Sequence, residues 1–159
     1  MPLYLVRHAK AGSRSDFDGN DIDRPLTNSG HRQAEELAKR LAAVSPTLVV
    51  SSPYKRCIET VEPLAVAMDL QVTLDERLSE FGNDLVQPDV SLFDLLHSVP
   101  DHAVLCSHGD VIPAVVHALS NSGMRIDGTS EWGKGSVWIL DRTDNRFVAA
   151  RAWAPPPVD

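Results

Sequence analysis

A short apolar run near the start of the chain, Leu3-Tyr4-Leu5-Val6, ends directly at Arg7-His8. Four β-prone apolar residues in a row are typical of a buried strand. In an open α/β sheet, ligands bind beyond the carboxyl ends of the strands. Arg7 and His8 are therefore candidates for a binding site, although the dipeptide alone fits a surface arginine and a hydrogen-bonded histidine equally well.

Strand patterns alternate with helical patterns along the rest of the chain. Short apolar runs predict strands at 47–51, 71–74 and 103–106, and a closing hairpin at 136–140 and 147–150. Apolar spacing and capping residues predict helices at about 28–44, 53–63, 92–99 and 110–119. This alternation predicts an α/β fold, a three-layer αβα sandwich whose sheet is mostly parallel with an antiparallel edge.

The second predicted helix carries a charged residue near a strand end. Ser52 is its expected N-cap, Pro53 its first residue, and Pro63 should kink or end it. Arg56 then lies in the first turn and adds its charge to the positive end of the helix dipole. An anion would be stabilised there. The polar stretch 12–28 is interpreted as a solvated loop from which Arg24 is kept as a candidate.

Length and composition limit the class of protein. The 159 residues, of which 43% are hydrophobic, suit one domain over 1–154 and a proline-rich C-terminal tail, 155–159, that is expected to be frayed. No signal-peptide core or membrane-length run is present, so we expect a cytoplasmic protein whose Cys57 and Cys106 are free thiols. The net charge of -7 argues against binding to a nucleic-acid polymer or a membrane surface, but a few converging arginines can still bind an anionic substrate.

Two cations and two imidazoles converge on one edge of the predicted sheet. The strand at 103–106 ends on Ser107-His108, as the first strand ends on Arg7-His8, and Arg56 lies near the carboxyl end of the strand at 47–51. Such a set suits a phosphoryl group, whose oxygens carry the transition-state charge.

The motifs that carry these residues resemble a known family. Leu5-Val6-Arg7-His8-Ala9, Ser51-Ser52-Pro53-x-x-Arg56-x-x-x-Thr60 and Ser107-His108-Gly109 resemble, in order, the three signature blocks of the histidine phosphatase superfamily, with its phosphoglycerate mutase-like fold. Arg24-Pro25-Leu26-Thr27 is similar to the compact phosphohistidine phosphatase branch. Glu80 with Asn83-Asp84, together with 134–138, is similar to histidine phosphatase domains fused to some Nudix hydrolases.

The resemblance implies a role for each candidate residue. His8 would attack phosphorus and form a phosphohistidine, with a backbone carbonyl fixing its tautomer, while Arg7 and Arg56 clamp the oxygens and a protonated His108 adds a donor. Glu80 is either the proton donor or a solvated loop carboxylate. Arg24 and Lys134 are either substrate-binding residues or surface charges. This chemistry requires no metal and no cofactor.

The implied activity is that of a metal-independent phosphatase acting on a phosphomonoester or phosphoanhydride. Its partner would be a phosphorylated small molecule, a nucleotide or a phosphohistidine protein. Glu80 favours a small phosphate or nucleotide, because a phosphohistidine's leaving imidazole needs less help from an acid. A protein phosphohistidine phosphatase in signalling and a non-catalytic phosphate-binding module are the alternatives. The sequence leaves the substrate, the oligomeric state and the pathway open.

Overall fold

A mixed sheet forms the centre of the molecule. The computed structural model describes residues 1–81 and 88–158. Within them, seven strands pair in the order β3-β2-β4-β1-β6-β7-β5. The strands are β1 (Pro2–Arg7), β2 (Leu48–Ser51), β3 (Val72–Leu74), β4 (Ala103–Ser107), β5 (Arg125–Ile126), β6 (Val137–Thr143) and β7 (Arg146–Trp153). Strands β3, β2, β4 and β1 are parallel, whereas β6 is antiparallel to both β1 and β7.

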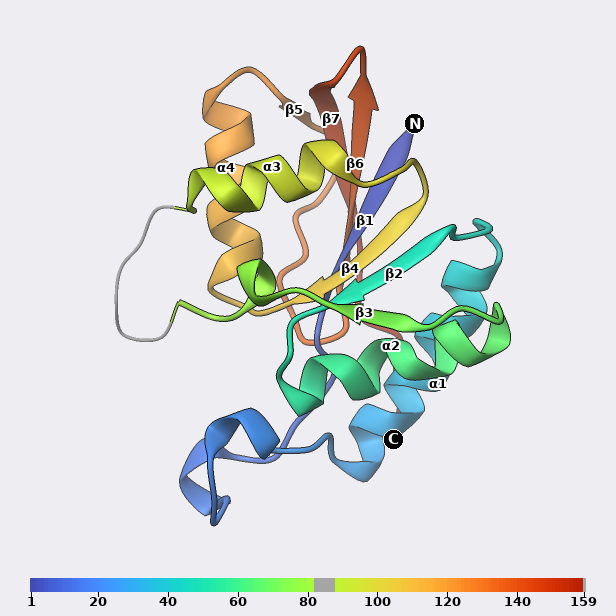
Figure 1. Ribbon diagram of the computed structural model, residues 1–159, viewed down its shortest axis with the longest axis vertical. Helices are drawn as coiled ribbons and strands as arrows, with labels where there is room; N and C mark the ends of the chain where they lie inside the picture. Colours follow the sequence, from blue (N-terminus) through green and yellow to red (C-terminus); the bar gives the residue numbers. More distant parts are fainter. Residues whose placement is uncertain (82–87, 159) are drawn as a thin grey trace.

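Helices cover both faces of this sheet. They are α1 (Asn28–Ala42), α2 (Lys55–Ala67), α3 (Val90–Ser98) and α4 (Val111–Asn121). Figure 1 shows α1 and α2 on one face and α3 and α4 on the other. The predicted three-layer α/β sandwich with a mostly parallel sheet is therefore confirmed. The antiparallel strand β6 lies inside the sheet, between β1 and β7, whereas the edge strand β5 is parallel to β7.

The alternation of side chains along β1 explains the three layers. Leu3 and Leu5 belong to the core that contains the buried residues of α3 and α4, whereas Tyr4 and Val6 belong to the core shared with α1 and α2. Successive residues of a strand point to opposite faces, so a strand buried on both faces is apolar throughout. The unbroken apolar run at the start of the chain is thus a consequence of its central position.

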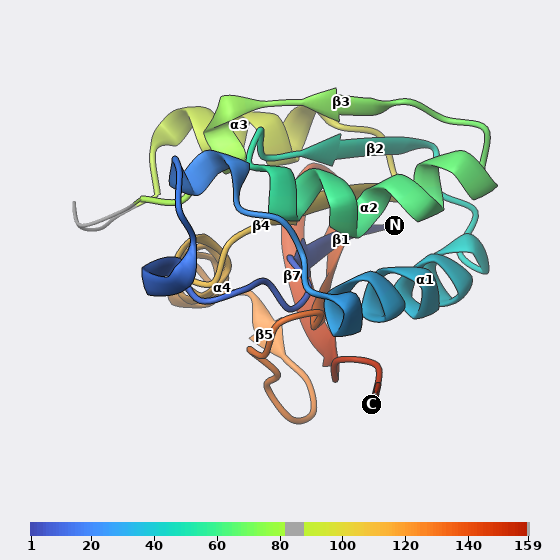
Figure 2. The same cartoon turned by 90° about the horizontal axis from the view of Figure 1, so that it is seen from below.

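The register of the parallel strands brings their carboxyl ends together. Arg7 is the partner of Ser107 across β1 and β4, and Ser51 is the partner of Cys106 across β2 and β4. The residues that follow these strands therefore begin at one edge. Figure 2 shows the segment between β1 and α1, which contains the 3-10 turns Arg14–Asp16 and Asp21–Asp23, lying along that edge.

The start and end of α2 differ from the prediction. The helix begins at Lys55 after Tyr54 as N-cap, so the predicted roles of Ser52 and Pro53 are wrong. The Ser52 hydroxyl lies 2.8 Å from Nε2 of His108 and accepts a hydrogen bond from the amide of Tyr54, the residue before the helix. Pro63 does not end α2, which continues to Ala67 because burial of its apolar face compensates for one missing backbone hydrogen bond.

Other local predictions had mixed outcomes. Helix α1 begins at Asn28, as predicted, and its N-cap Thr27 accepts a hydrogen bond from the Gly30 amide. The two-residue strand β5 was not predicted, because it is too short to show a pattern. Pro156 is buried, so the tail packs against the domain at that residue and is not frayed there.

Candidate active site

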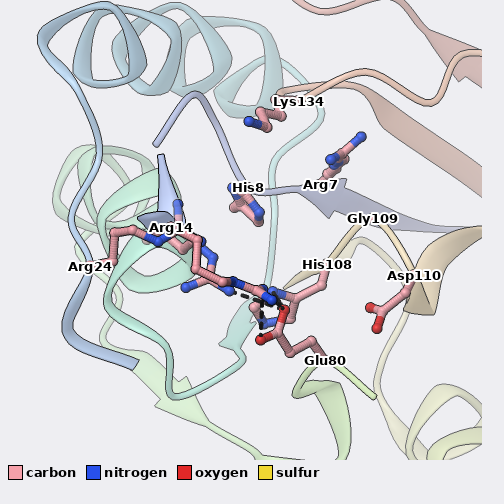
Figure 3. Close-up of a pocket in the computed structure, with 10 residues that line it drawn as sticks. Arg7, His8, Arg14, Arg24, Glu80, His108, Gly109, Asp110 and Lys134 are labelled. Atoms are coloured by element: carbon pink, nitrogen blue, oxygen red, sulfur yellow. Dashed lines mark hydrogen bonds and ion pairs between the residues drawn. The ribbon is translucent and has the colours of Figure 1, made fainter. Parts of the chain in front are cut away.

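A cavity of about 390 Å³ opens at the edge where β1, β2 and β4 end. All seven residues predicted for the site line it, together with three others (Figure 3): Arg7, His8, Arg24, Arg56, Glu80, His108 and Lys134, with Arg14, Gly109 and Asp110. The fold therefore brings the whole predicted set together, including the three residues for which a surface position was the alternative.

His8 is held in one tautomer. Its Nδ1 lies 2.8 Å from the carbonyl oxygen of Ala9. A carbonyl only accepts hydrogen bonds, so Nδ1 carries the proton and Nε2 keeps its lone pair. Burial, together with the charges of Arg56 and Arg7, lowers the pKa of His8 to about 3. The imidazole is therefore neutral at physiological pH, as a nucleophile requires.

Arg7 and Arg56 flank the imidazoles with unused donors. Arg56 is 1% exposed, and the Nε atoms of both arginines are buried with no hydrogen-bond partner in the described part of the chain. Gly109 packs directly on Arg7, since a Cβ at this position would lie 2.6 Å from the Arg7 Cζ. Buried donors without partners are costly unless a ligand satisfies them, and an oxyanion is the complement of a guanidinium.

His108 lies beside His8, with ring centroids 5.6 Å apart. Burial, with the neighbouring His8 and the charges of Arg56 and Arg7, lowers the pKa of His108 to about 2. The predicted protonated state of His108 is therefore wrong for the site without ligand, because a third buried positive charge next to two arginines is unfavourable.

Two carboxylates meet the guanidinium of Arg56. Its Nη2 donates to Asp21 Oδ2 and to Glu80 Oε2, both at 3.1 Å. Arg14 donates to Glu80 as well, at 3.3 Å, and Glu80 Oε2 lies 3.9 Å from Nδ1 of His108. Glu80 is thus an ion-paired residue of the cavity wall, and the alternative of a solvated loop carboxylate is excluded.

Arg24 and Lys134 both belong to the cavity wall. Arg24 is buried, donates to Asp21 Oδ1 at 2.9 Å and also donates to the carbonyl of Gly12. Burial and the charges of four nearby cations lower the pKa of Lys134. The interpretation of 12–28 as a solvated loop was wrong for this part, because the partly buried Asp21 forms ion pairs with two buried arginines, Arg24 and Arg56.

A buried glutamine connects the segment that follows β1 with the segment that carries Lys134. Gln33 of α1 accepts a hydrogen bond from the Lys10 amide at 2.9 Å and donates to the Lys134 carbonyl at 3.1 Å. The neighbouring Gly135 amide donates to the carbonyls of Arg7 and His8, both at 3.1 Å. These bonds hold the segment that carries Lys134 against the end of β1.

Sequence reasoning missed several of these contacts. Asp21 precedes Arg24 by three residues, and this spacing in a 3-10 turn was the available signal for their ion pair. Arg14 and Asp110 had no recognisable signal, since only tertiary packing brings them to the cavity. The same holds for the contacts that Gln33 makes with Lys10 and Lys134. Asn83-Asp84, part of the resemblance to the Nudix-linked domains, lies outside the described residues.

The comparisons with known proteins agree with this geometry. The sequence model of the histidine phosphatase superfamily (branch 1) matches residues 3–87, more than half of the chain. The protein therefore belongs to the histidine phosphatase superfamily.

Individual relatives give finer comparisons. An 8-oxo-(d)GTP phosphatase of Mycolicibacterium smegmatis is 32% identical over 97% of this chain, which spans about half of that relative, 48%. The structure of the protein histidine phosphatase SixA complexed with tungstate superposes with a TM-score of 0.72 at 18% identity, covering 98% of this chain and 97% of that one. A mycobacterial glucosyl-3-phosphoglycerate phosphatase gives 0.68 at 20%, covering 96% and 97%. At these identities the two structures support the fold.

Residues 1–81 and 88–158 contain neither a metal-binding cluster nor a membrane-spanning helix. No group of three or more His, Cys, Asp or Glu side chains among them is arranged to hold a metal ion. In the same residues, no helix has the length and apolar character of a membrane-spanning helix.

The two buried histidines make stability depend on pH. Below the ordinary histidine pKa of about 6.5, unfolded chains take up protons that folded His8 and His108 do not. The free energy of unfolding should therefore fall as the pH is lowered from about 6.5 toward 4.5, measured by urea denaturation. In His8→Gln, the free energy of unfolding should depend less on pH. The control His31→Gln, which changes an exposed histidine, should keep most of the pH dependence. An equally steep fall in His8→Gln would contradict the assignment.

Gln33 should contribute measurably to stability. Gln33→Ala leaves the Lys10 amide without its buried partner, which costs about 1–3 kcal/mol. Urea denaturation at pH 7 measures this loss against Gln71→Ala, which truncates an exposed glutamine. Equal stabilities of the two variants would show that the connection does not hold the cavity together.

Proposed function

We propose that the protein is a metal-independent phosphatase that hydrolyses a phosphomonoester or phosphoanhydride through a phosphohistidine on His8. The observation that carries this proposal is a neutral imidazole, its Nδ1 bonded to Ala9, between two arginines whose buried Nε atoms lack partners within residues 1–81 and 88–158. The 32% identity with a phosphatase over nearly the whole chain supports it.

The first step is an in-line displacement at phosphorus. His8 Nε2 forms the N–P bond while the bond from phosphorus to the leaving oxygen breaks. Arg7 and Arg56 donate to the equatorial oxygens, where charge accumulates in the transition state. In the second step, water attacks phosphorus, the N–P bond breaks, and inorganic phosphate and the neutral imidazole are regenerated.

Glu80 is the proposed proton donor for the leaving oxygen. In the empty site its carboxylate is paired with Arg56 and Arg14. A bound phosphate dianion competes for Arg56 and brings negative charge next to Glu80, which favours the protonated carboxyl. After donating its proton, the carboxylate accepts one from the attacking water in the second step.

We propose a small phosphorylated molecule, nucleotides included, as the substrate. The cavity is open and larger than a phosphate, and the proposed acid serves alcohol leaving groups. Arg24 and Lys134 would bind the oxygens of such a substrate. The fold is shared with the protein histidine phosphatase SixA, so a phosphohistidine protein is the second candidate. The cytoplasmic location and the absence of nucleic-acid and membrane partners stay predictions.

The proposed reaction depends on His8 and on arginine charges that take the role of metal ions in other phosphoryl-transfer sites. Phosphate release from nucleotides, sugar phosphates and a phosphohistidine protein should persist in EDTA and fall by at least about 10³-fold in His8→Ala. His31→Ala, an exposed histidine variant, is the matched control. Turnover that EDTA abolishes, or that survives in His8→Ala, would refute the mechanism.

Glu80→Gln should separate substrates by their leaving groups. For an alkyl phosphate, kcat should fall by about 10²-fold, because the alkoxide then leaves without a proton. For a nitrophenyl phosphate, whose leaving group needs no acid, the change should stay within about threefold. Steady-state kinetics with both substrates measure the difference. An equal loss for both would indicate that Glu80 only holds Arg56.

A further inference from the structure

A buried serine contacts the nitrogen of His108 that points away from the cavity. Ser52 Oγ lies 2.8 Å from Nε2 of His108, and Ser52 and His108 are 0% and 2% exposed. Ser52 follows β2 directly, and its amide donates to the Cys106 carbonyl of β4 at 3.1 Å. The serine is therefore fixed in place by the sheet on which the site is built.

The hydrogen bonds of Ser52 determine which partner is the donor. The Tyr54 amide donates to Ser52 Oγ at 3.3 Å, so the hydroxyl oxygen already accepts one hydrogen bond. A buried hydroxyl hydrogen also needs an acceptor. Among residues 1–81 and 88–158, the acceptor recorded for it is Nε2 of His108. Ser52 therefore donates to His108, and Nε2 carries no proton.

Cys57 is the other side chain near Nε2. Its Sγ lies 3.5 Å from that nitrogen and 3.6 Å from the Ser107 carbonyl, which accepts the thiol hydrogen. A thiol is a weak donor and a weak acceptor, so the shorter contact from the serine hydroxyl determines the state of the ring.

The opposite nitrogen of His108 faces the cavity. Its Nδ1 is buried and lacks a hydrogen-bond partner among the described residues, and Glu80 Oε2 lies 3.9 Å from it. A neutral ring whose Nε2 accepts from Ser52 carries its proton on Nδ1. That N–H is then available to a ligand oxygen in the cavity.

We infer that Ser52 is a positioning residue that keeps His108 neutral with its proton on Nδ1, so that His108 donates to a phosphate oxygen without being charged. The inference rests on the proposed function, in which the cavity binds a phosphoryl group. It replaces the protonated His108 of the sequence-based expectation by a neutral donor.

The charges around the ring fit a neutral donor. Arg7 and Arg56 already supply two positive charges, while Glu80 and Asp21 oppose them on the Arg56 side. A third buried cation would add desolvation cost and repulsion, whereas an oriented N–H adds a hydrogen bond alone. The low pKa of His108, about 2, has the same cause.

Nitrogen-15 NMR of the histidine rings in the whole protein tests the inference directly. Two-bond ¹H–¹⁵N correlations at pH 7 should show His108 with a protonated Nδ1 and an unprotonated Nε2, both without ligand and with saturating inorganic phosphate. A His108 protonated on Nε2, or on both nitrogens with phosphate bound, would overturn it.

Variants test the role of the hydroxyl. Ser52→Ala should let the Nε2–H tautomer appear and weaken inorganic phosphate as a competitive inhibitor about tenfold, the worth of one hydrogen bond. Ser52→Thr, which keeps the hydroxyl, should restore the Nδ1–H spectrum and most of the affinity. Ser51→Ala is the matched control, since the Ser51 hydroxyl donates to the Ser52 carbonyl and does not contact His108. An unchanged tautomer in Ser52→Ala would refute the positioning role.

The two readouts distinguish failure of this inference from failure of the proposed function. The NMR spectrum of the free protein reports the tautomer whether or not any substrate is turned over. A protein with the Nδ1–H tautomer but no hydrolysis would refute the phosphatase, whereas turnover with a charged or Nε2–H His108 would refute the role of Ser52.

Discussion

The buried charge of Arg56 is the interaction on which the rest of the site depends. A guanidinium that is 1% exposed requires partners, and Asp21 and Glu80 supply them from two segments far apart in the chain. The ion pair of Asp21 with Arg56 holds the segment between β1 and α1 over the sheet edge. Asp21 also forms ion pairs with Arg24 and Arg14 of the same segment. The walls of the cavity are therefore held together by the same cation that is proposed to bind phosphate.

The same buried cations explain why two neutral imidazoles can lie at the centre of the site. Burial and the arginine charges disfavour protonation of both rings. Each ring then has one nitrogen bonded to the protein, Nδ1 of His8 to Ala9 and Nε2 of His108 to Ser52. The other nitrogen of His8, Nε2, keeps a lone pair that can attack phosphorus. The other nitrogen of His108, Nδ1, carries a hydrogen that can bind a phosphate oxygen.

Much of the fold and site was predictable because it depends on local patterns. The strand ends at Arg7-His8 and Ser107-His108, and Arg56 beside β2, follow from apolar runs that stop abruptly and from parallel strands that share an edge. The protonation of His108 was not predictable, since it depends on burial among charges that only the folded chain assembles. The capping role expected of Ser52 failed for a related reason, because a tertiary contact with His108 orients its hydroxyl.

The most direct test of the account is to trap the intermediate. Brief incubation of the protein with a ³²P-labelled nucleotide in EDTA, followed by an alkaline quench and peptide mapping, should yield an acid-labile phosphate on His8. The label should be absent from His8→Ala. Turnover without any labelled protein, or a label on another residue, would contradict the claim that a neutral imidazole between two buried arginines is the nucleophile.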